Sequence, residues 1–243
     1  MELRERVALV TGAGHRVGRA IALGLARSGA RVGVHYNETA EGARDVVDTI
    51  REQGGDAFAI GADLSDPVAA GRLADEVAGH WGVLDVLVNS AGVMHRTPVA
   101  TVTPAEWDAV FAINLRAPFF VAQAAARVMG TRGGVIVNIS DLAGLEAWSD
   151  YIPHGISKAG VIQMTRGLAH ALAPHIRVNA IAPGAVLLPA AWDEAAAAHL
   201  VATTPLRRLG SPEDVVGAVL YLIQADYVTG ETIVVDGGRR VRT

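Results

Sequence analysis

The sequence predicts an α/β fold in which helices flank a doubly wound parallel β-sheet. Short β-branched runs alternate with longer amphipathic stretches along the chain. The strand-like runs are almost continuously apolar, a pattern typical of strands that are covered on both faces. The chain has 243 residues, of which 51% are hydrophobic and 27 are glycine, and this composition suits helices packed tightly on a sheet. We therefore expect a single domain over residues 1–243.

The first half of the chain reads as strand-like segments separated by helical ones. In chain order these segments cover residues 6–12, 17–29, 31–36, 39–54, 57–65, 67–82 and 84–92. This alternation is the βαβ pattern, in which each helix connects two parallel strands.

The second half continues the alternation, with two helices in succession at its start. We expect helices around 104–114, 116–130, 151–173 and 211–223, strands at 133–140, 176–184 and 231–238, and a looser Ala-rich segment at 187–204. The stretch "SPEDVV" opens the last helix with Ser211 as its cap, Pro212 in the first turn and acids against the helix dipole. It therefore indicates architecture, not chemistry.

Composition narrows the classes of partner. The net charge of −4 gives no general attraction for nucleic acid or for an anionic membrane. The chain contains no cysteine, so disulfides and thiolate metal sites are excluded, and its eight histidines show no metal-ligand spacing. The N-terminus runs from charges directly into a strand without an apolar targeting segment. We expect a cytoplasmic protein with a small-molecule substrate and no bound metal.

A glycine-rich turn, "TGAGHRVG" at Thr11–Gly18, lies between the first strand and the first helix. Glycines at this place let the backbone approach a pyrophosphate, and the helix N-terminus offers unpaired N–H groups and a positive dipole. The spacing is TGxxxxxG, with Arg16 two residues before the last glycine, and not GxGxxG. The turn therefore predicts a dinucleotide site of a particular kind.

With this turn, six further stretches resemble the short-chain dehydrogenase/reductase family in their order along the chain. They are "ADLS" at 62–65, "NSAG" at 89–92, "INL" at 113–115, "SKAG" at 157–160, "APG" at 182–184 and "YVTGETIVVDGG" at 227–238. The resemblance implies a Rossmann fold and a nicotinamide dinucleotide cofactor. It implies cofactor contacts at Gly12, His15, Arg16, Val17, His35, Tyr36, Asn37, Thr39, Asp63, Leu64, Asn89, Ser90, Ala91, Gly92, Lys158, Pro183, Gly184 and Val186.

The catalytic positions depart from the family pattern at two places. The family uses Asn, Ser, Tyr and Lys, with the Tyr four residues before the Lys and the Ser thirteen before the Tyr. Asn114 and Lys158 match that pattern, but His154 stands at the Tyr position and Asp141 at the Ser position. We assign all four residues to the candidate catalytic set.

One branch of the family, the pteridine and dihydromonapterin reductases, resembles this sequence at some of the positions where it departs from the family pattern. The shared features are Arg16, "HY" at 35–36, the acid at 141 and the "DGGR" stretch at 236–239. Reducing a C=N bond requires a proton on a ring nitrogen, which a carboxyl group can relay. Met94 stands where those relatives have a stacking aromatic residue. The expected substrate contacts are Arg16, Met94, Asp141, Tyr151 and Trp192, and carbonyl reduction stays open as the other chemistry.

The end of the second strand favours NADPH over NADH. An acid there would bind ribose hydroxyls and repel a 2′-phosphate, but the chain has Asn37 and Thr39, which can donate hydrogen bonds. His15 and Arg16 add nearby positive charge that favours a 2′-phosphate, and only the carboxylate of Glu38 disfavours this phosphate. The predicted cofactor is therefore NADP(H).

Three roles for His154 follow from its place one helical turn before Lys158. It could donate the proton, relay a proton from Asp141, or fill space while Asp141 delivers the proton. The neighbouring ammonium disfavours a protonated imidazole and Asp141 favours it. The sequence favours Asp141 as the more important residue, and Tyr151 is a further candidate phenol.

Two interpretations of function remain from the sequence. The first is an NADPH-dependent oxidoreductase that reduces C=N or C=O in a small substrate; the second is a dinucleotide-binding or regulatory homologue that lost turnover with the tyrosine. The family resemblance further implies a substrate lid at 187–204. It also implies a homotetramer built on the helices around 116–130 and 151–173, both of which are apolar on more than one face.

Overall fold

Seven parallel strands form one sheet in the computed structural model, which describes residues 1–188 and 193–241. The strands follow the order β3-β2-β1-β4-β5-β6-β7, so the order reverses beside β1, between β1 and β4. Their bounds are β1 Val7–Val10, β2 Arg31–Tyr36, β3 Ala57–Gly61, β4 Val86–Asn89, β5 Gly134–Ile139, β6 Ile176–Pro183 and β7 Thr232–Val235. The predicted doubly wound parallel sheet is confirmed.

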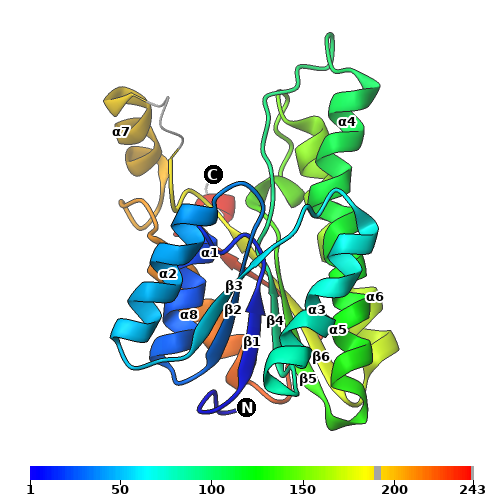
Figure 1. Cartoon of the computed structure of the whole chain (residues 1–243). Helices are drawn as coiled ribbons and strands as arrows, with labels where there is room; N and C mark the ends of the chain where they lie inside the picture. Colours follow the sequence, from blue (N-terminus) through cyan, green and yellow to red (C-terminus); the bar gives the residue numbers. More distant parts are fainter. Residues whose placement is uncertain (189–192, 242–243) are drawn as a thin grey trace.

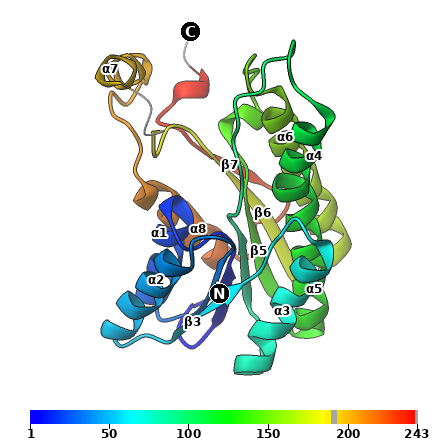
Figure 2. The ribbon, with the colours of Figure 1, turned by 45° about the horizontal axis from the view of Figure 1, so that its top comes forward.

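Helices cover both faces of this sheet, as Figures 1 and 2 show: α1, α2 and α8 lie on one side, and α3, α5 and α6 on the other. The helix bounds are α1 Arg16–Arg27, α2 Ala40–Glu52, α3 Pro67–Trp81, α4 Pro104–Phe111, α5 Ala117–Met129, α6 Ile152–Leu172, α7 Glu194–Thr203 and α8 Pro212–Gln224. Short turns complete the fold: a π turn η1 Ala112–Arg116 and the 3₁₀ turns η2 Gly130–Arg132, η3 Leu142–Gly144 and η4 Arg239–Val241.

The strand β1 shows why its sequence is continuously apolar. All four of its residues are buried. Ala8 and Val10 belong to the apolar core beneath α1, α2 and α8, whereas Val7 and Leu9 belong to the core beneath α3 and α5. Successive side chains of a strand point to opposite faces, so a strand covered on both faces has no polar position. The sheet thus separates two apolar cores.

Two elements differ from the sequence-based expectation. The predicted break near residue 115 is bridged by the π turn η1, so α4, η1 and α5 form one continuous helical stretch. The segment predicted to be loose contains the helix α7, which begins where Asp193 Oδ1 accepts a hydrogen bond from Ala196 N at 2.7 Å. Alanine has the highest helix propensity, so this Ala-rich segment becomes helical once a cap is provided.

One helical stretch among the described residues, Pro104–Arg132, is long and apolar enough to cross a membrane. Half of its most apolar window is buried inside the protein, and α5 packs against α3 and the sheet. A core helix therefore accounts for its composition.

Candidate active site at the carboxyl ends of the strands

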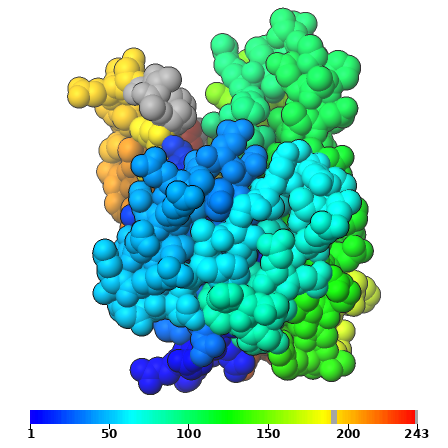
Figure 3. All heavy atoms as spheres, viewed as in Figure 1, coloured from blue at the N-terminus to red at the C-terminus, as the bar shows by residue number. Residues whose placement is uncertain are grey.

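A cavity of about 960 Å³ opens at the carboxyl ends of the strands, at the side where the strand order reverses. In Figure 3 it is the hollow at the top of the molecule, between the yellow segment with α7 and the green segment with α4. Most of the predicted site residues line it: Gly12, His15, Arg16, Val17, His35, Tyr36, Asn37, Thr39, Leu64, Ser90, Ala91, Gly92, Met94, Asp141, Tyr151, His154, Lys158, Pro183, Gly184 and Val186. Trp192 lies outside the described residues.

The glycine turn forms a close-packed cradle beside the start of α1. Gly12 has a φ of +65°, and a Cβ there would lie 2.8 Å from Ala91 Cα. A Cβ on Gly18 would lie 2.2 Å from the carbonyl oxygen of Gly12. The first turn of α1 has no acidic residue and its N-cap, His15, makes no side-chain hydrogen bond to it. These free N–H groups and the positive end of the helix suit a pyrophosphate, so the residues present fit a dinucleotide.

His35 holds this turn in place. Its Nδ1 accepts a hydrogen bond from Gly12 N at 3.1 Å, and its Nε2 lies 3.1 Å from the carbonyl oxygen of Ala62. Burial lowers the pKa of His35, and the ring is therefore neutral with its proton on Nε2. The backbone occupies both ring nitrogens, so His35 positions the cofactor turn and offers no polar atom to a ligand.

Two predicted cofactor residues do not line the cavity. The carboxylate of Asp63 turns to Ser65, accepting hydrogen bonds from its backbone N and its Oγ at 2.8 Å each, and these bonds lower the pKa of Asp63. Asn89 is buried beneath the cavity, and its Nδ2 donates to Asn138 Oδ1 at 2.9 Å and to Pro118 O at 3.2 Å. Asp63 thus stabilises the turn that follows it, and Asn89 connects β4 to β5 and to the start of α5.

Arg16 reaches across the cavity mouth. Its backbone has a φ of +51°, which is unusual for a residue other than glycine. Its guanidinium donates a hydrogen bond to the carbonyl oxygen of Leu187 at 3.0 Å. The side chain therefore connects the start of α1 to the segment that precedes α7.

Lys158, on α6, is buried at the floor of the cavity. Its Nζ donates to the carbonyl oxygen of Ile139 at 2.9 Å, and a Cβ on Gly92 would lie 3.4 Å from this nitrogen. Burial lowers the pKa of Lys158, while the charge of Asp141 raises it. Ser140 Oγ donates to the Lys158 carbonyl oxygen at 2.9 Å, so this neighbouring hydroxyl cannot replace the serine that Asp141 displaces.

Asn114 does not line the cavity but stands behind it, in the π turn. Its Oδ1 accepts from Val93 N at 2.8 Å, and its Nδ2 donates to Val93 O at 2.9 Å and to Ser157 Oγ at 3.1 Å. The pair of bonds to Val93 fixes which end of the amide is oxygen. Sequence reasoning identified Asn114 but missed Val93, whose contribution comes only from its backbone.

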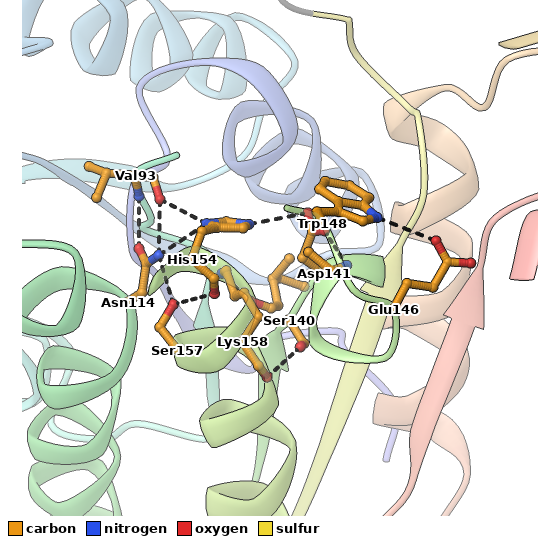
Figure 4. Close-up of polar contacts among 11 residues, drawn as sticks. Val93, Asn114, Ser140, Asp141, Glu146, Trp148, His154, Ser157 and Lys158 are labelled. Carbon is orange, nitrogen blue, oxygen red and sulfur yellow. Dashed lines mark hydrogen bonds and ion pairs between the residues drawn. The ribbon is translucent and has the colours of Figure 1, made fainter. Parts of the chain in front are cut away.

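His154 and Asp141 face each other at the polar corner of the cavity, as Figure 4 shows. The His154 ring is buried, with Nδ1 3.1 Å from Val93 O and 3.3 Å from Asn114 Nδ2. Its Nε2 lies 3.8 Å from Asp141 Oδ2 and has no hydrogen-bond partner. Asp141 caps the turn η3 through Oδ1, which accepts from Ala143 N at 2.8 Å, and its side chain is 26% exposed.

Apolar and aromatic side chains form the opposite wall. Met94, predicted to contact substrate, is 42% exposed and lines the cavity. Tyr151 stands at the N-cap of α6 with its ring edge-on to Trp148, the two ring centroids being 6.3 Å apart. Trp148 and Leu142 also line the cavity and were missed, since both lie in a loop whose course the sequence does not fix.

No group of three or more His, Cys, Asp or Glu side chains within residues 1–188 and 193–241 is arranged to hold a metal ion.

Comparison with known proteins gives consistent matches over nearly the whole chain. The profile of the family described as "Enoyl-(Acyl carrier protein) reductase" matches residues 12–240. A 3-oxoacyl-(acyl-carrier-protein) reductase of Staphylococcus aureus is 37% identical over 237 residues, covering 95% of this chain and 96% of the relative. A protein named as a candidate ketoacyl reductase of the granaticin polyketide synthase, from Streptomyces violaceoruber, is 38% identical over 242 residues, covering 96% and 95% respectively.

A solved structure shows the same architecture. A protein of Sinorhizobium meliloti 1021, named as a candidate short-chain alcohol dehydrogenase, superposes with a TM-score of 0.94 at 38% identity, covering 100% of this chain and 99% of that chain. The seven-stranded sheet and its helical layers are thus shared with a solved relative.

Proposed function

Since this chain belongs to the short-chain dehydrogenase/reductase family, whose members bind a nicotinamide dinucleotide, we propose that it is an NADPH-dependent reductase of carbonyl groups in small, largely apolar substrates. The observation that carries the proposal is the position of Lys158. Its buried ammonium lies in one cavity with the uncapped start of α1 and the Asp141–His154 corner. A protein without turnover has no need of a polar corner beside that lysine.

The dinucleotide supplies a hydride when it is bound. The glycine cradle and the first turn of α1 would hold its pyrophosphate, and Lys158 would hold the nicotinamide ribose. The proton for the substrate oxygen enters from the Asp141–His154 corner. The cavity wall around Met94 and Trp148 excludes water from the reacting groups.

The preference for NADPH rests on charge at the adenosine end. Arg16 is exposed, and its guanidinium reaches the cavity mouth, while Tyr36, Asn37 and Thr39 line the cavity with no acid at the end of β2. A guanidinium is the side chain best matched to a phosphate. Glu38 also lines the cavity, and its negative charge would repel a 2′-phosphate. We propose that the attraction of Arg16 for this phosphate exceeds the repulsion by Glu38.

Reduction of a C=N bond in a pterin is the second chemistry, and one observation supports it. A carboxylate, Asp141, stands at the substrate side of the cavity opposite the flat-ring contact that Met94 can provide. The relatives described above are named for ketoacyl reduction, which favours the carbonyl.

The experiment is NADPH oxidation by the purified protein with three substrate sets: β-ketoacyl thioesters, cyclic diketones and aromatic ketones; dihydrobiopterin and dihydrofolate; and no substrate. Turnover with the first set supports carbonyl reduction, and turnover confined to the second set replaces it with C=N reduction. Tight NADPH binding without any turnover supports the dinucleotide-binding homologue instead. NADH in place of NADPH tests the cofactor assignment in the same assay.

We further propose a cytoplasmic homotetramer that binds neither nucleic acid nor membrane. Segment 187–204, of which 189–192 lie outside the described residues, is the candidate substrate lid. An apolar groove along α4, η1, α5 and α6 supports self-association, with Phe119 39% exposed beside Leu115, Met164 and Leu168. Sedimentation of a monomer at micromolar concentration contradicts the tetramer.

A further inference from the structure

The hydrogen bonds around Asn114 determine which nitrogen of His154 carries a proton. The two hydrogens of Asn114 Nδ2 are donated to Val93 O at 2.9 Å and to Ser157 Oγ at 3.1 Å. Ser157 Oγ has its own hydrogen committed to the carbonyl oxygen of His154 at 2.7 Å, so it accepts from the amide. No amide hydrogen is left for His154 Nδ1. That nitrogen therefore carries its own hydrogen and donates it to Val93 O at 3.1 Å.

The opposite nitrogen, Nε2, is consequently the one that exchanges protons. In the neutral ring it holds a lone pair, and it is buried without a hydrogen-bond partner. Asp141 Oδ2 lies 3.8 Å away, beyond a direct hydrogen bond but near enough to stabilise a positive ring. Asp141 is held in this place because its other oxygen caps η3 through Ala143 N.

We propose, on the basis of the carbonyl reductase function above, that His154 is the catalytic residue that exchanges the proton with the substrate oxygen, through Nε2, and that Asp141 is the positioning residue that keeps the imidazolium available. A phenol is thus replaced by an imidazole–carboxylate pair. Figure 4 shows the arrangement, with Val93 and Asn114 on one side of the ring and Asp141 on the other.

The proton and electron count closes in both directions. In reduction, a hydride adds to the carbonyl carbon, the π electrons of the C=O bond move to oxygen, and this oxygen takes the proton from Nε2. The N–H bond breaks, His154 becomes neutral, and its Nδ1–H stays on Val93 O. In oxidation, the alcohol O–H gives its proton to Nε2 as the hydride leaves the carbon. Asp141 remains a carboxylate throughout.

The charged groups around His154 oppose each other. Lys158 follows it by one turn on α6 and disfavours the imidazolium, whereas Asp141 on η3 favours it. Other titratable groups near the corner are Tyr151 at the start of α6, Glu146 beside Trp148, Arg239 in the cavity lining, and the Arg96–Asp150 pair, in which Nη2 lies 2.9 Å from Oδ2. One oxygen of Asp141 accepts a hydrogen bond from Ala143 N and the other faces His154 Nε2, so the ring, and not the carboxylate, is assigned the proton exchange. The proposal therefore gives His154 the role for which the sequence favours Asp141.

Proton exchange at one group gives the two directions of the reaction opposite pH profiles. Ketone reduction consumes the imidazolium and should fall as pH rises. Alcohol oxidation with NADP⁺ consumes the neutral ring and should rise over the same interval. Any single acid–base group gives such a pair of profiles, so His154 is identified as that group by the change in their common midpoint when it is replaced.

Three variants test the proposal. His154→Phe keeps the ring volume and should lower reduction by about 10²-fold or more, the usual contribution of a general acid. Asp141→Asn keeps an oxygen for Ala143 N and removes only the charge, so the reduction profile should move to lower pH while its limiting rate changes less. His154→Tyr restores a phenol and should keep the opposite pH profiles but move their common midpoint, because a phenol then titrates in place of the imidazole. Unchanged reduction in His154→Phe, with folding verified by circular dichroism, overturns the proposal.

A readout without turnover separates this inference from the proposed function. Nitrogen-15 NMR of the cofactor-free protein reports which ring nitrogen of His154 bears hydrogen. We expect Nδ1–H with an unprotonated Nε2 at high pH, protonation of Nε2 on acidification, and protonation only at lower pH in Asp141→Asn. A neutral ring with its hydrogen on Nε2 overturns the proposed roles of His154 and Asp141. If the tautomer is as expected but no ketone is reduced, the proposed carbonyl reductase function fails, whereas the hydrogen-bond arrangement of His154 and Asp141 stands.

Discussion

The two ends of the cavity are built on different principles. At the nucleotide end, the glycine cradle and the start of α1 present backbone N–H groups, and the side chain of His35 serves that backbone. At the substrate end, Lys158, His154 and Asp141 present side chains, each held by a different backbone group: Ile139 O, Val93 O and Ala143 N respectively. The nucleotide end depends on the absence of side chains, and the substrate end on their identity.

This difference explains where the chain tolerates departures from its family. A pyrophosphate requires a fixed backbone shape, so a single added Cβ at Gly12 or Gly18 meets other backbone atoms. Proton transfer requires only a group that can carry a proton at the right place, and imidazole, phenol and carboxyl can each do so. Substitution at the substrate end therefore changes how the reaction depends on pH before it removes the reaction.

The largest effect is expected at the substrate end. Lys158→Met should lower reduction by about 10²-fold or more, because the nicotinamide ribose loses the ammonium that would hold it in the reacting position. The same variant should be more stable at neutral pH. Burial makes the pKa of Lys158 lower in the folded protein than in the unfolded chain. The folded state is therefore most stable above the pKa of the unfolded chain and loses stability as pH falls through the pKa of the folded protein. Replacing the ammonium removes that loss, since a buried charge is unfavourable.

Steady-state kinetics and thermal unfolding check this pair of effects. Arg72→Met, at an exposed position of α3, is the control and should leave both unchanged. A Lys158→Met protein that is both inactive and less stable would show that the lysine is structural.

The nucleotide end should respond in stability as well as binding. Gly12→Ala forces a φ of +65° on a residue with a Cβ that would lie 2.8 Å from Ala91 Cα. We expect a loss of about 1–3 kcal/mol in the free energy of unfolding, together with weaker NADPH binding. Denaturant unfolding and fluorescence titration measure the two.

Gly71→Ala is the matched control, since nothing lies within 4 Å of a Cβ there and the residue is inside α3. It should gain about 0.5–1 kcal/mol, the usual helix-interior difference between glycine and alanine. Equal responses of Gly12→Ala and Gly71→Ala would remove the case for a rigid cradle.

The difference between local patterns and long-range contacts determines how much of the fold and the site could be predicted from the sequence. The strand runs, the glycine turn and the catalytic spacing are local patterns, so the sheet was predicted and most of the expected site residues lie together in the cavity. Asn89 faces protein partners because its hydrogen bonds depend on Asn138 and Pro118, which no local pattern assigns to it. Asp63 bonds Ser65, two residues on, in a local turn that competes with a ligand for the carboxylate. The tautomer of His154 likewise depends on a long-range contact with Val93.

The two departures in secondary structure have related causes. The π turn η1 adds one residue to a helical turn, which the periodicity of 104–130 reads as a break. The helix α7 has a weak apolar face, so periodicity alone did not predict it. Patterns of side chains predict elements well where the elements pack on a core, and poorly where the backbone responds to its cap or to a tertiary contact.

Cofactor preference offers a smaller and more selective effect. Arg16→Ala should raise the Kd for NADPH about tenfold, equivalent to about 1.4 kcal/mol, and leave the Kd for NADH nearly unchanged. The reason is that only NADPH carries the 2′-phosphate that the guanidinium can bind. Isothermal titration measures both constants.

Arg19→Ala, exposed on the same helix and absent from the cavity wall, is the control for charge alone. Equal weakening of NADPH and NADH in Arg16→Ala would assign this arginine to the segment before α7, through its bond to Leu187 O, and not to the phosphate.

The smallest effect concerns His35, the buried histidine whose ring bonds the backbone of the glycine turn. The pKa of His35 is lowered by burial, so its contribution to stability is fully present above the unfolded pKa, about 6.5, and is lost as pH falls toward the folded value. Protonation turns Nδ1 from an acceptor into a donor that faces Gly12 N–H, and the loss of that bond costs about 0.5–1.5 kcal/mol.

Thermal unfolding between pH 8 and pH 5 should therefore show a Tm decrease in the wild type of about 2–4 °C for each 1 kcal/mol lost, beyond that of His35→Asn. The asparagine Oδ1 takes the place of Nδ1 as acceptor for Gly12 N and cannot become a donor when the pH falls. His35→Leu lacks the acceptor and should bind NADPH weakly at every pH, whereas His35→Asn should bind it without the acid-side weakening. Parallel Tm profiles of wild type and His35→Asn would contradict this prediction. They would mean that protonation of His35 does not weaken the turn, and that Gly12 and Gly18 alone give the turn its shape.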